Sequence, residues 1–161
     1  MGTRLVVLLG MSPGVLHTVL CALRANAATP TEVHIVATRR APVHEAIEIA
    51  RTCPCPGTDK PPLAPSTTIH VHALRVDDVT DEEGINELLE KLEEATRGAK
   101  HAIIDVTGGR KLASIIAAMY SVRRGYTTIY TPIPHEEQQR INRAETLCDK
   151  TTRTPPKPIT L

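Results

Sequence analysis

The chain has 161 residues, and its 19 lysines and arginines against 18 aspartates and glutamates give a net charge of +1. This near-neutral charge excludes a strongly basic surface as the main means of binding nucleic acid, and we expect no DNA partner. The chain has three tyrosines but neither tryptophan nor phenylalanine, so stacking of successive bases on aromatic platforms is disfavoured. The length and an apolar share of 41% are typical of a single globular domain.

The sequence has no uninterrupted apolar run long enough for a membrane-spanning helix, and we expect no membrane partner. The apolar stretch near the N-terminus is interrupted by Gly10, Pro13 and His17 and lacks an obvious cleavage site. We interpret it as the first strand, loop and helix of a cytoplasmic protein.

Strand and helix patterns alternate along the chain. Apolar or alternating runs predict strands at residues 4–9, 32–37, 68–75, 101–106 and 127–131. Helical spacing predicts helices at 13–26, 42–52, 82–97 and 110–124, with Ser12 and Asp81 as candidate caps. This order predicts an α/β fold, with a Rossmann-like, mostly parallel sheet in the order 3-2-1-4-5 flanked by helices. We assign residues 1–134 to this domain and 135–161 to a C-terminal extension of it, which can add a helix or short strands.

A proline-rich segment at 53–66 separates the second helix from the third strand and carries Cys53 and Cys55. The third strand then places His70 and His72 on one face. One interpretation is a Cys/His metal site, and the other is loop thiols beside a solvated strand face. One residue rather than two separates the cysteines, which favours the second interpretation. Whether the two cysteines bind metal or form a disulfide is open at this stage.

Two loops of unusual composition follow the first and fourth expected strands. Their residues are Gly10, Met11, Ser12, Pro13 and Gly14, and Thr107, Gly108, Gly109, Arg110 and Lys111. In the order 3-2-1-4-5 these two strands are neighbours at the point where ligands bind in open parallel sheets.

The composition of the two loops suits a phosphate. Glycines let backbone amides approach an anion, and helix N-termini offer unpaired N–H groups. Ser12 and Thr107 add hydroxyl donors, and Arg110 and Lys111 add positive charge. The spacing matches neither a Walker A loop nor the dinucleotide-binding G-x-G-x-x-G pattern. We therefore predict an anion-binding site of another kind.

The first and fourth helices are apolar around most of their circumference. A helix that covers one face of a sheet needs only one apolar stripe, so a second partner is indicated. We predict a homodimer that packs through these two helices and brings its phosphate loops near a two-fold axis, which favours a symmetric ligand. The alternative is burial of these helices under the C-terminal tail.

The segment 103–112, Ile-Ile-Asp-Val-Thr-Gly-Gly-Arg-Lys-Leu, resembles the signature of CRISPR-associated Rossmann fold (CARF) domains. In that family the fourth strand ends in Asp-x-Thr-Gly-Gly-x-Lys before an apolar helix. The segments 9–14 and 76–81 are also similar to the family, and the resemblance spans about residues 4–134. It implies a homodimer that binds cyclic oligoadenylate, the messenger of type III CRISPR defence, across its two-fold axis.

CARF domains usually carry a fused effector, for which this chain is too short, and a stand-alone CARF domain resembles a ring nuclease. The resemblance implies cleavage of the messenger, most simply cyclic tetra-adenylate, without metal or cofactor. A ribose 2′-OH would attack the adjacent phosphate and leave a 2′,3′-cyclic phosphate. By resemblance, Lys111 would stabilise charge on the phosphate and Ser12 would orient the reacting groups. The ring size, tetra- or hexa-adenylate, is open.

Further candidates follow the carboxyl ends of strands. The expected ligand contacts there are Thr38, Arg39, Arg40, Tyr130 and Pro132, and His17 and His135 are candidates for proton transfer. Two alternatives to a ring nuclease are a non-catalytic module that senses or sequesters the same messenger, and a nucleotide-binding regulator unrelated to CRISPR.

Overall fold

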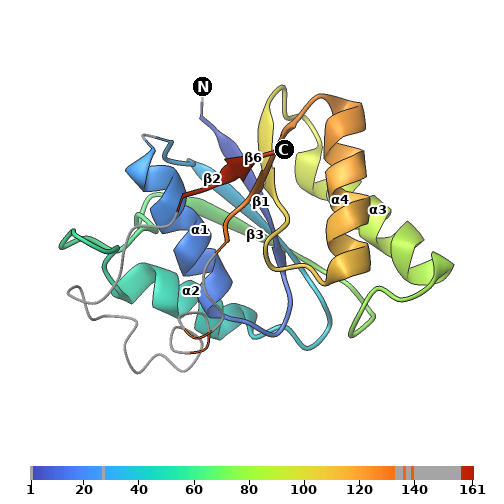
Figure 1. The fold of residues 1–161 in the computed structure, drawn as a ribbon, viewed down its shortest axis with the longest axis horizontal. Coiled ribbons are helices and arrows are strands. Elements are labelled where there is room, and N and C mark those ends of the chain that lie inside the picture. Colours follow the sequence, from blue (N-terminus) through green and yellow to red (C-terminus); the bar gives the residue numbers. More distant parts are fainter. Residues whose placement is uncertain (1, 27, 133–135, 137–138, 140–156) are drawn as a thin grey trace.

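The sheet of this protein has six strands in the order β3-β2-β1-β4-β5-β6 (Figure 1). The computed structural model describes residues 2–26, 28–132, 136, 139 and 157–161. The strands are β1 (Arg4–Leu9), β2 (Glu32–Ala37), β3 (Thr68–Ala73), β4 (Ala102–Asp105), β5 (Thr127–Tyr130) and β6 (Ile159–Thr160). The first five run parallel and β6 runs antiparallel to β5. The predicted α/β fold and strand order are therefore confirmed, and the C-terminal extension adds one strand to the sheet.

Four helices flank the sheet: α1 (Gly14–Ala25), α2 (Val43–Thr52), α3 (Glu82–Thr96) and α4 (Lys111–Arg124). Helices α1 and α2 pack on one face and α3 and α4 on the other (Figure 1). Asp81 caps α3 as expected, since its carboxylate accepts a hydrogen bond of 2.8 Å from the Gly84 N–H. Helix α1 begins one residue later than expected, directly after Pro13. None of the described helices is both long and apolar enough to cross a membrane.

The central strand β1 explains why its sequence is a continuous apolar run. Leu5 and Val7 are fully buried against α1 and α2, while Val6 is fully buried against α3 and α4. Burial of each such side chain contributes about 1.5–3 kcal/mol. A strand covered on both faces needs apolar residues at every position, and this fixes β1 in the middle of the sheet.

Helix α1 is covered by its own chain. Its ten consecutive residues Gly14 to Leu23 are buried, and its apolar side chains pack with β1, β2, α2 and Leu63 of the proline-rich segment. The expectation that α1 needs a second protein chain as partner was therefore wrong. The sequence pattern could not reveal that the irregular proline-rich segment supplies the missing cover.

Helix α4 differs from α1, because an apolar stripe on it stays exposed. Ile115, Met119 and Val122 lie on successive turns and are 56%, 48% and 63% exposed. This stripe on α4 is the part of the predicted dimer surface that the fold leaves open.

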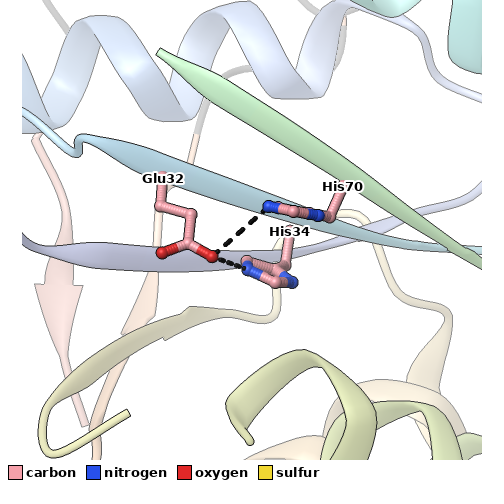
Figure 2. A group of neighbouring side chains, drawn as sticks. All are labelled: Glu32, His34 and His70. Carbon is pink, nitrogen blue, oxygen red and sulfur yellow. Dashed lines mark hydrogen bonds and ion pairs between the residues drawn. The ribbon is translucent and has the colours of Figure 1, made fainter. Parts of the chain in front are cut away.

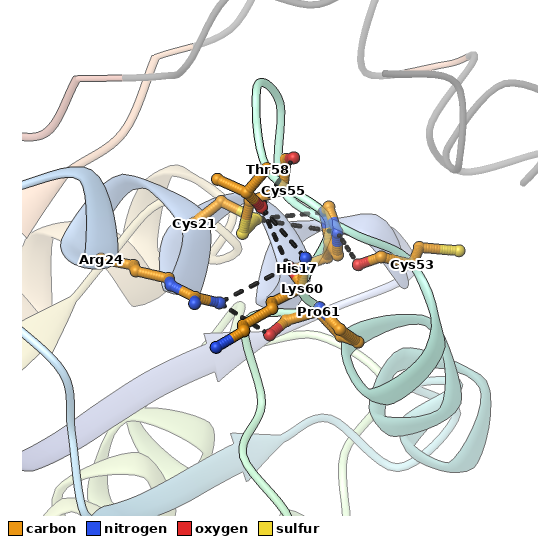
Figure 3. The surroundings of a disulfide bond; sticks show 8 residues. All are labelled: His17, Cys21, Arg24, Cys53, Cys55, Thr58, Lys60 and Pro61. Atoms are coloured by element: carbon orange, nitrogen blue, oxygen red, sulfur yellow. Dashed lines mark hydrogen bonds between the residues drawn. A yellow bond between two sulfur atoms is a disulfide. The ribbon is translucent and has the colours of Figure 1, made fainter.

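The proline-rich segment is fastened to α1 by a disulfide between Cys21 and Cys55 (Figure 3). Nearby, Arg24 Nη1 donates a hydrogen bond of 3.0 Å to the Pro61 carbonyl oxygen. The interpretation of Cys55 as a loop thiol was wrong, because Cys55 forms a disulfide. The sequence did not indicate the partner, which lies in the middle of a helix. His72 of β3 lies on the opposite face of the sheet, beside α3, so Cys55 forms no metal site with it.

Candidate functional site

A cavity of about 420 Å³ lies at the carboxyl ends of the parallel strands. The loops after β1 and β4 form two of its walls, and the segments after β2, β3 and β5 complete it. It is lined by nine of the residues that the sequence predicts: Gly10, Met11, Ser12, Thr38, Thr107, Gly108, Gly109, Arg110 and Tyr130. Two loops almost 100 positions apart in the sequence thus line one cavity, and their role in binding a ligand stays a prediction.

Glycines allow the two loops to come into contact. A Cβ on Gly108 would clash with the carbonyl oxygen of Leu8, near the end of β1. A Cβ on Gly109 would lie 2.7 Å from the Ser114 hydroxyl of α4, which is closer than packed side chains tolerate. The Gly-Gly pair is therefore required for the β4 loop to cross the end of β1 closely. The same crossing leaves main-chain groups of both loops beside the cavity.

A buried carboxylate supports the β4 loop from below. Asp105, at the end of β4, accepts hydrogen bonds of 3.0 Å from both the N–H and the hydroxyl of Thr107. The Thr107 hydroxyl oxygen also accepts a 2.8 Å bond from the Thr131 N–H. Burial raises the pKa of Asp105 to about 7, although these hydrogen bonds act in the opposite direction. Asp105 and Thr131 were missed as site residues, because their role depends on how β4 and β5 lie side by side.

Arginine–carboxylate pairs border the cavity. Arg39 donates bonds of 2.9 and 3.0 Å to the two oxygens of Asp77, and this lowers the pKa of the Asp77 carboxyl. Arg40 lies 3.6 Å from the same carboxylate. Arg110 Nη1 lies 3.3 Å from Asp78 Oδ2. All three arginines are largely exposed, and exposed pairs contribute little to stability, so a phosphate can replace the carboxylates at low cost.

Asp77 and Asp78 line the cavity, although the sequence offered them only as part of a family resemblance. Nothing in the composition of the loop after β3 indicates that each carboxylate faces an arginine of another loop. The position of this loop, after a parallel strand next to β2, is the feature from which these two residues could have been predicted.

Some predicted contacts lie beside the cavity rather than in its lining: Pro13, Gly14, Arg39, Arg40, Lys111 and Pro132. Lys111 is the first residue of α4 and its side chain is exposed, next in the chain to Arg110. The first turn of a helix has N–H groups without acceptors inside the helix and carries a positive partial charge. The cationic rim of the cavity therefore combines a helix N-terminus with two adjacent basic side chains.

The expectation that His17 assists proton transfer is corrected. Its side chain is completely buried, its Nε2 lies 2.9 Å from the Cys53 carbonyl oxygen, and its ring contacts Cys21 (Figure 3). It belongs to the packing of the proline-rich segment against α1. His135 lies outside the described residues, and within the described part of the chain no histidine lines the cavity.

Comparison with known proteins finds one curated relative and solved structures of similar fold. No family model matches the chain. A curated relative, a CRISPR system ring nuclease of Saccharolobus solfataricus, is 29% identical over 141 residues, which are 87% of this chain and 76% of the relative. This chain is a homologue of a CRISPR ring nuclease.

Two solved structures share the fold. Csm6 of Enterococcus italicus, bound to cyclic hexa-2′-fluoro-hexa-dAMP, matches 99% of this chain with a TM-score of 0.63 and 13% identity. Can2 of Sulfobacillus thermosulfidooxidans, in complex with cyclic tetra-adenylate, matches 81% with a TM-score of 0.54 and 18% identity. This chain spans 42% and 32% of those two longer proteins. The Rossmann-like fold predicted from the alternation of strands and helices is confirmed, and these two proteins share it.

Proposed function

We propose that this protein binds a cyclic oligoadenylate at the cavity between the β1 and β4 loops and cleaves it. The observation that carries the proposal is the meeting of Ser12, Thr107 and Arg110 in one cavity at the ends of adjacent parallel strands. The relationship to a ring nuclease supports the choice of substrate and reaction. Cyclic tetra-adenylate is the preferred ring.

The cavity favours a ligand shared by two chains. Its volume of about 420 Å³ falls in the lower part of the range of roughly 300–1,000 Å³ that holds one small molecule. A ring of four nucleotides is larger than that. In a homodimer with two such cavities around a two-fold axis, each chain would bind half of the ring. The exposed stripe on α4 is the surface that we assign to this dimer.

The substrate supplies the nucleophile of the reaction. The oxygen of a ribose 2′-OH forms a bond to the adjacent phosphorus, the bond from phosphorus to the 5′-oxygen breaks, and a 2′,3′-cyclic phosphate results. The proton of the 2′-OH leaves and the 5′-oxygen gains one. The protein must hold the attacking and leaving oxygens in line and stabilise negative charge on the phosphorane.

The residues around the cavity suit these tasks. Lys111 and Arg110 supply positive charge at the N-terminus of α4, and Ser12 of the opposite loop orients the ribose or the phosphate. Arg39 and Arg40 contact further phosphates after release from Asp77. The bases are expected to lie against aliphatic and main-chain groups, with Tyr130 as the aromatic side chain of the lining. The reaction is proposed to need no metal ion.

Calorimetry and product analysis on the same samples test this proposal. We expect one ring per two chains, followed by conversion to linear products with 2′,3′-cyclic phosphate ends. Binding at this ratio without any product would favour the alternative of a sensing or sequestering module. Absence of binding to every cyclic oligoadenylate, together with binding of a mononucleotide at one per chain, would contradict both.

A further inference from the structure

A second group of polar side chains lies at the other end of the sheet, on the face covered by α3. Glu32 and His34 of β2 and His70 of the edge strand β3 point their polar atoms at one another (Figure 2). Glu32 Oε1 lies 2.6 Å from His34 Nε2 and 3.4 Å from His70 Nε2. Two imidazole nitrogens thus lie beside one carboxylate oxygen, and the three atoms are within 4.8 Å of one another.

The pairing of β2 with β3 brings these residues together. His34 lies directly opposite His70 in the parallel register, and their rings stack with centroids 4.4 Å apart. Residues two apart in a strand share a face, so Glu32 joins them. The hydrogen-bonded strands fix the main-chain positions of the three ligands, which lowers the ordering cost of binding an ion.

A second layer of groups orients His34. Its Nδ1 lies 2.8 Å from His72 Nε2, and His72 Nδ1 lies 3.5 Å from Glu94 Oε2 of α3. Glu94 in turn accepts from the Lys91 ammonium at 3.3 Å. Metal-binding histidines commonly donate their second N–H to a carboxylate, a main-chain carbonyl or water, and here the imidazole of His72 occupies that position.

The ring tautomers of His34 and His72 are compatible with one additional cation bound to His34. When neutral His34 donates from Nε2 to Glu32, its Nδ1 must accept from His72 Nε2. Neutral His72 then presents a bare Nδ1 to the Glu94 carboxylate. When an ion takes the place of the Nε2 proton on His34, Nδ1–H donates to His72, and His72 Nδ1–H donates to Glu94. Every contact from His34 through His72 to Glu94 then has one donor and one acceptor, and both imidazole rings are neutral.

A positively charged side chain also borders the Glu32 carboxylate. The Arg4 guanidinium lies 3.5 Å from the Glu32 carboxylate, and its positive charge would repel a metal ion bound there.

We propose that Glu32, His34 and His70 form a binding site for a divalent transition metal ion of the zinc class. Two imidazoles and one carboxylate are ligands that zinc accepts, with water in the fourth position. In a tetrahedral site with bonds of about 2.0–2.1 Å, ligand atoms lie about 3.3 Å apart. The Glu32–His70 separation already fits, and the Glu32–His34 separation must lengthen. The ion would clamp the edge strand β3 to β2.

This site is independent of the proposed ring cleavage. Its ligands belong to the first half of β2 and β3, whereas the cavity lies beyond the carboxyl ends of the strands. The ion is therefore expected to stabilise the sheet without entering the reaction.

Zinc titration of tag-free protein, stripped with EDTA and dialysed, tests the proposal. We expect one zinc ion per chain by calorimetry and a higher melting temperature with zinc. With cobalt as the probe, we expect a tetrahedral visible spectrum without a thiolate charge-transfer band. His70→Gln should weaken zinc binding at least about tenfold, since loss of even an outer-layer partner costs about 10–100-fold.

Matched variants make the outcome decisive. His44→Gln removes an exposed histidine from α2, on the other face of the sheet, and should bind zinc like wild type. His72→Gln should weaken binding but keep the ratio of one ion per chain. His70 is 45% exposed as a side chain, so its replacement should leave the fold intact, which circular dichroism checks. No zinc binding by wild type, or equal affinity in His70→Gln, would overturn the proposal.

Discussion

Asp105 accepts two hydrogen bonds of 3.0 Å from Thr107, one from its N–H and one from its hydroxyl. These bonds fix the conformation of the β4 loop at the point where the strand ends. Asp105 is completely buried, so it positions the loop beneath the cavity and does not touch a ligand. The geometry of the loop thus depends on a carboxylate whose charge is costly to bury.

Stability should depend on the ionisation of Asp105. Its pKa rises from 3.8 in the unfolded chain to about 7 in the folded protein, so the folded state binds the extra proton between these values. The resulting stabilisation is complete below pH 3.8 and is lost as the pH rises to about 7. Asp105→Asn removes this titration. Denaturant unfolding should show wild type losing stability relative to Asp105→Asn between pH 4 and 7, by up to about 4 kcal/mol, and a constant difference above pH 8. A pH-independent difference would contradict this.

Lys111→Ala should reduce ring cleavage about 10²–10³-fold, as removal of one charge-stabilising donor does in other enzymes. The side chain is exposed, so the melting temperature should change little. Lys100→Ala, which removes another exposed lysine before β4, is the matched control and should cleave like wild type. Single-turnover rates measure both. Equal rates for Lys111→Ala and wild type would exclude Lys111 from the site.

Gly108→Ala should disrupt the contact between the two loops, because the new Cβ would collide with the Leu8 carbonyl. We expect loss of ligand binding and destabilisation by about 1–3 kcal/mol, as for other overpacked sites. Gly125→Ala is the comparison. It has a φ of +73° and open space around its Cβ position, so it should cost about 1–2 kcal/mol and leave binding intact. Binding by Gly108→Ala at wild-type affinity would refute the requirement for close contact.

Met119→Glu places a charge in the exposed stripe on α4. If the stripe forms the dimer, the variant should be a monomer by light scattering and should cleave the ring poorly, while circular dichroism shows an intact fold. Leu161→Glu changes another exposed apolar residue, 62% exposed at the C-terminus, and should leave the dimer intact. A Met119→Glu protein that remains dimeric would place the interface elsewhere.

Local patterns predicted the fold well, because each strand and helix carries its own signal. The buried run of β1, the Asp81 cap and the two glycine loops are all properties of neighbouring residues. The predicted strand order makes β1 and β4 neighbours, so the loops after them were expected to meet. Open parallel sheets bind ligands at this place, where the strand order reverses.

The features that sequence reasoning missed are contacts between distant segments. The Cys21–Cys55 disulfide joins a helix to an irregular segment, and no spacing rule connects such positions. The convergence of Glu32, His34 and His70 requires the exact register of β2 against β3. The prediction for His17 was wrong because this residue, one turn into α1, lies beneath the proline-rich segment rather than beside the cavity.

The most direct measurement of the central claim is a single-turnover reaction. Excess protein is incubated with labelled cyclic tetra-adenylate in EDTA, and the products are separated by chromatography and identified by mass spectrometry. We predict that wild type converts the ring to linear products with 2′,3′-cyclic phosphate ends, and that Lys111→Ala leaves the ring intact over the same time. An intact ring after prolonged incubation with wild type would contradict the account.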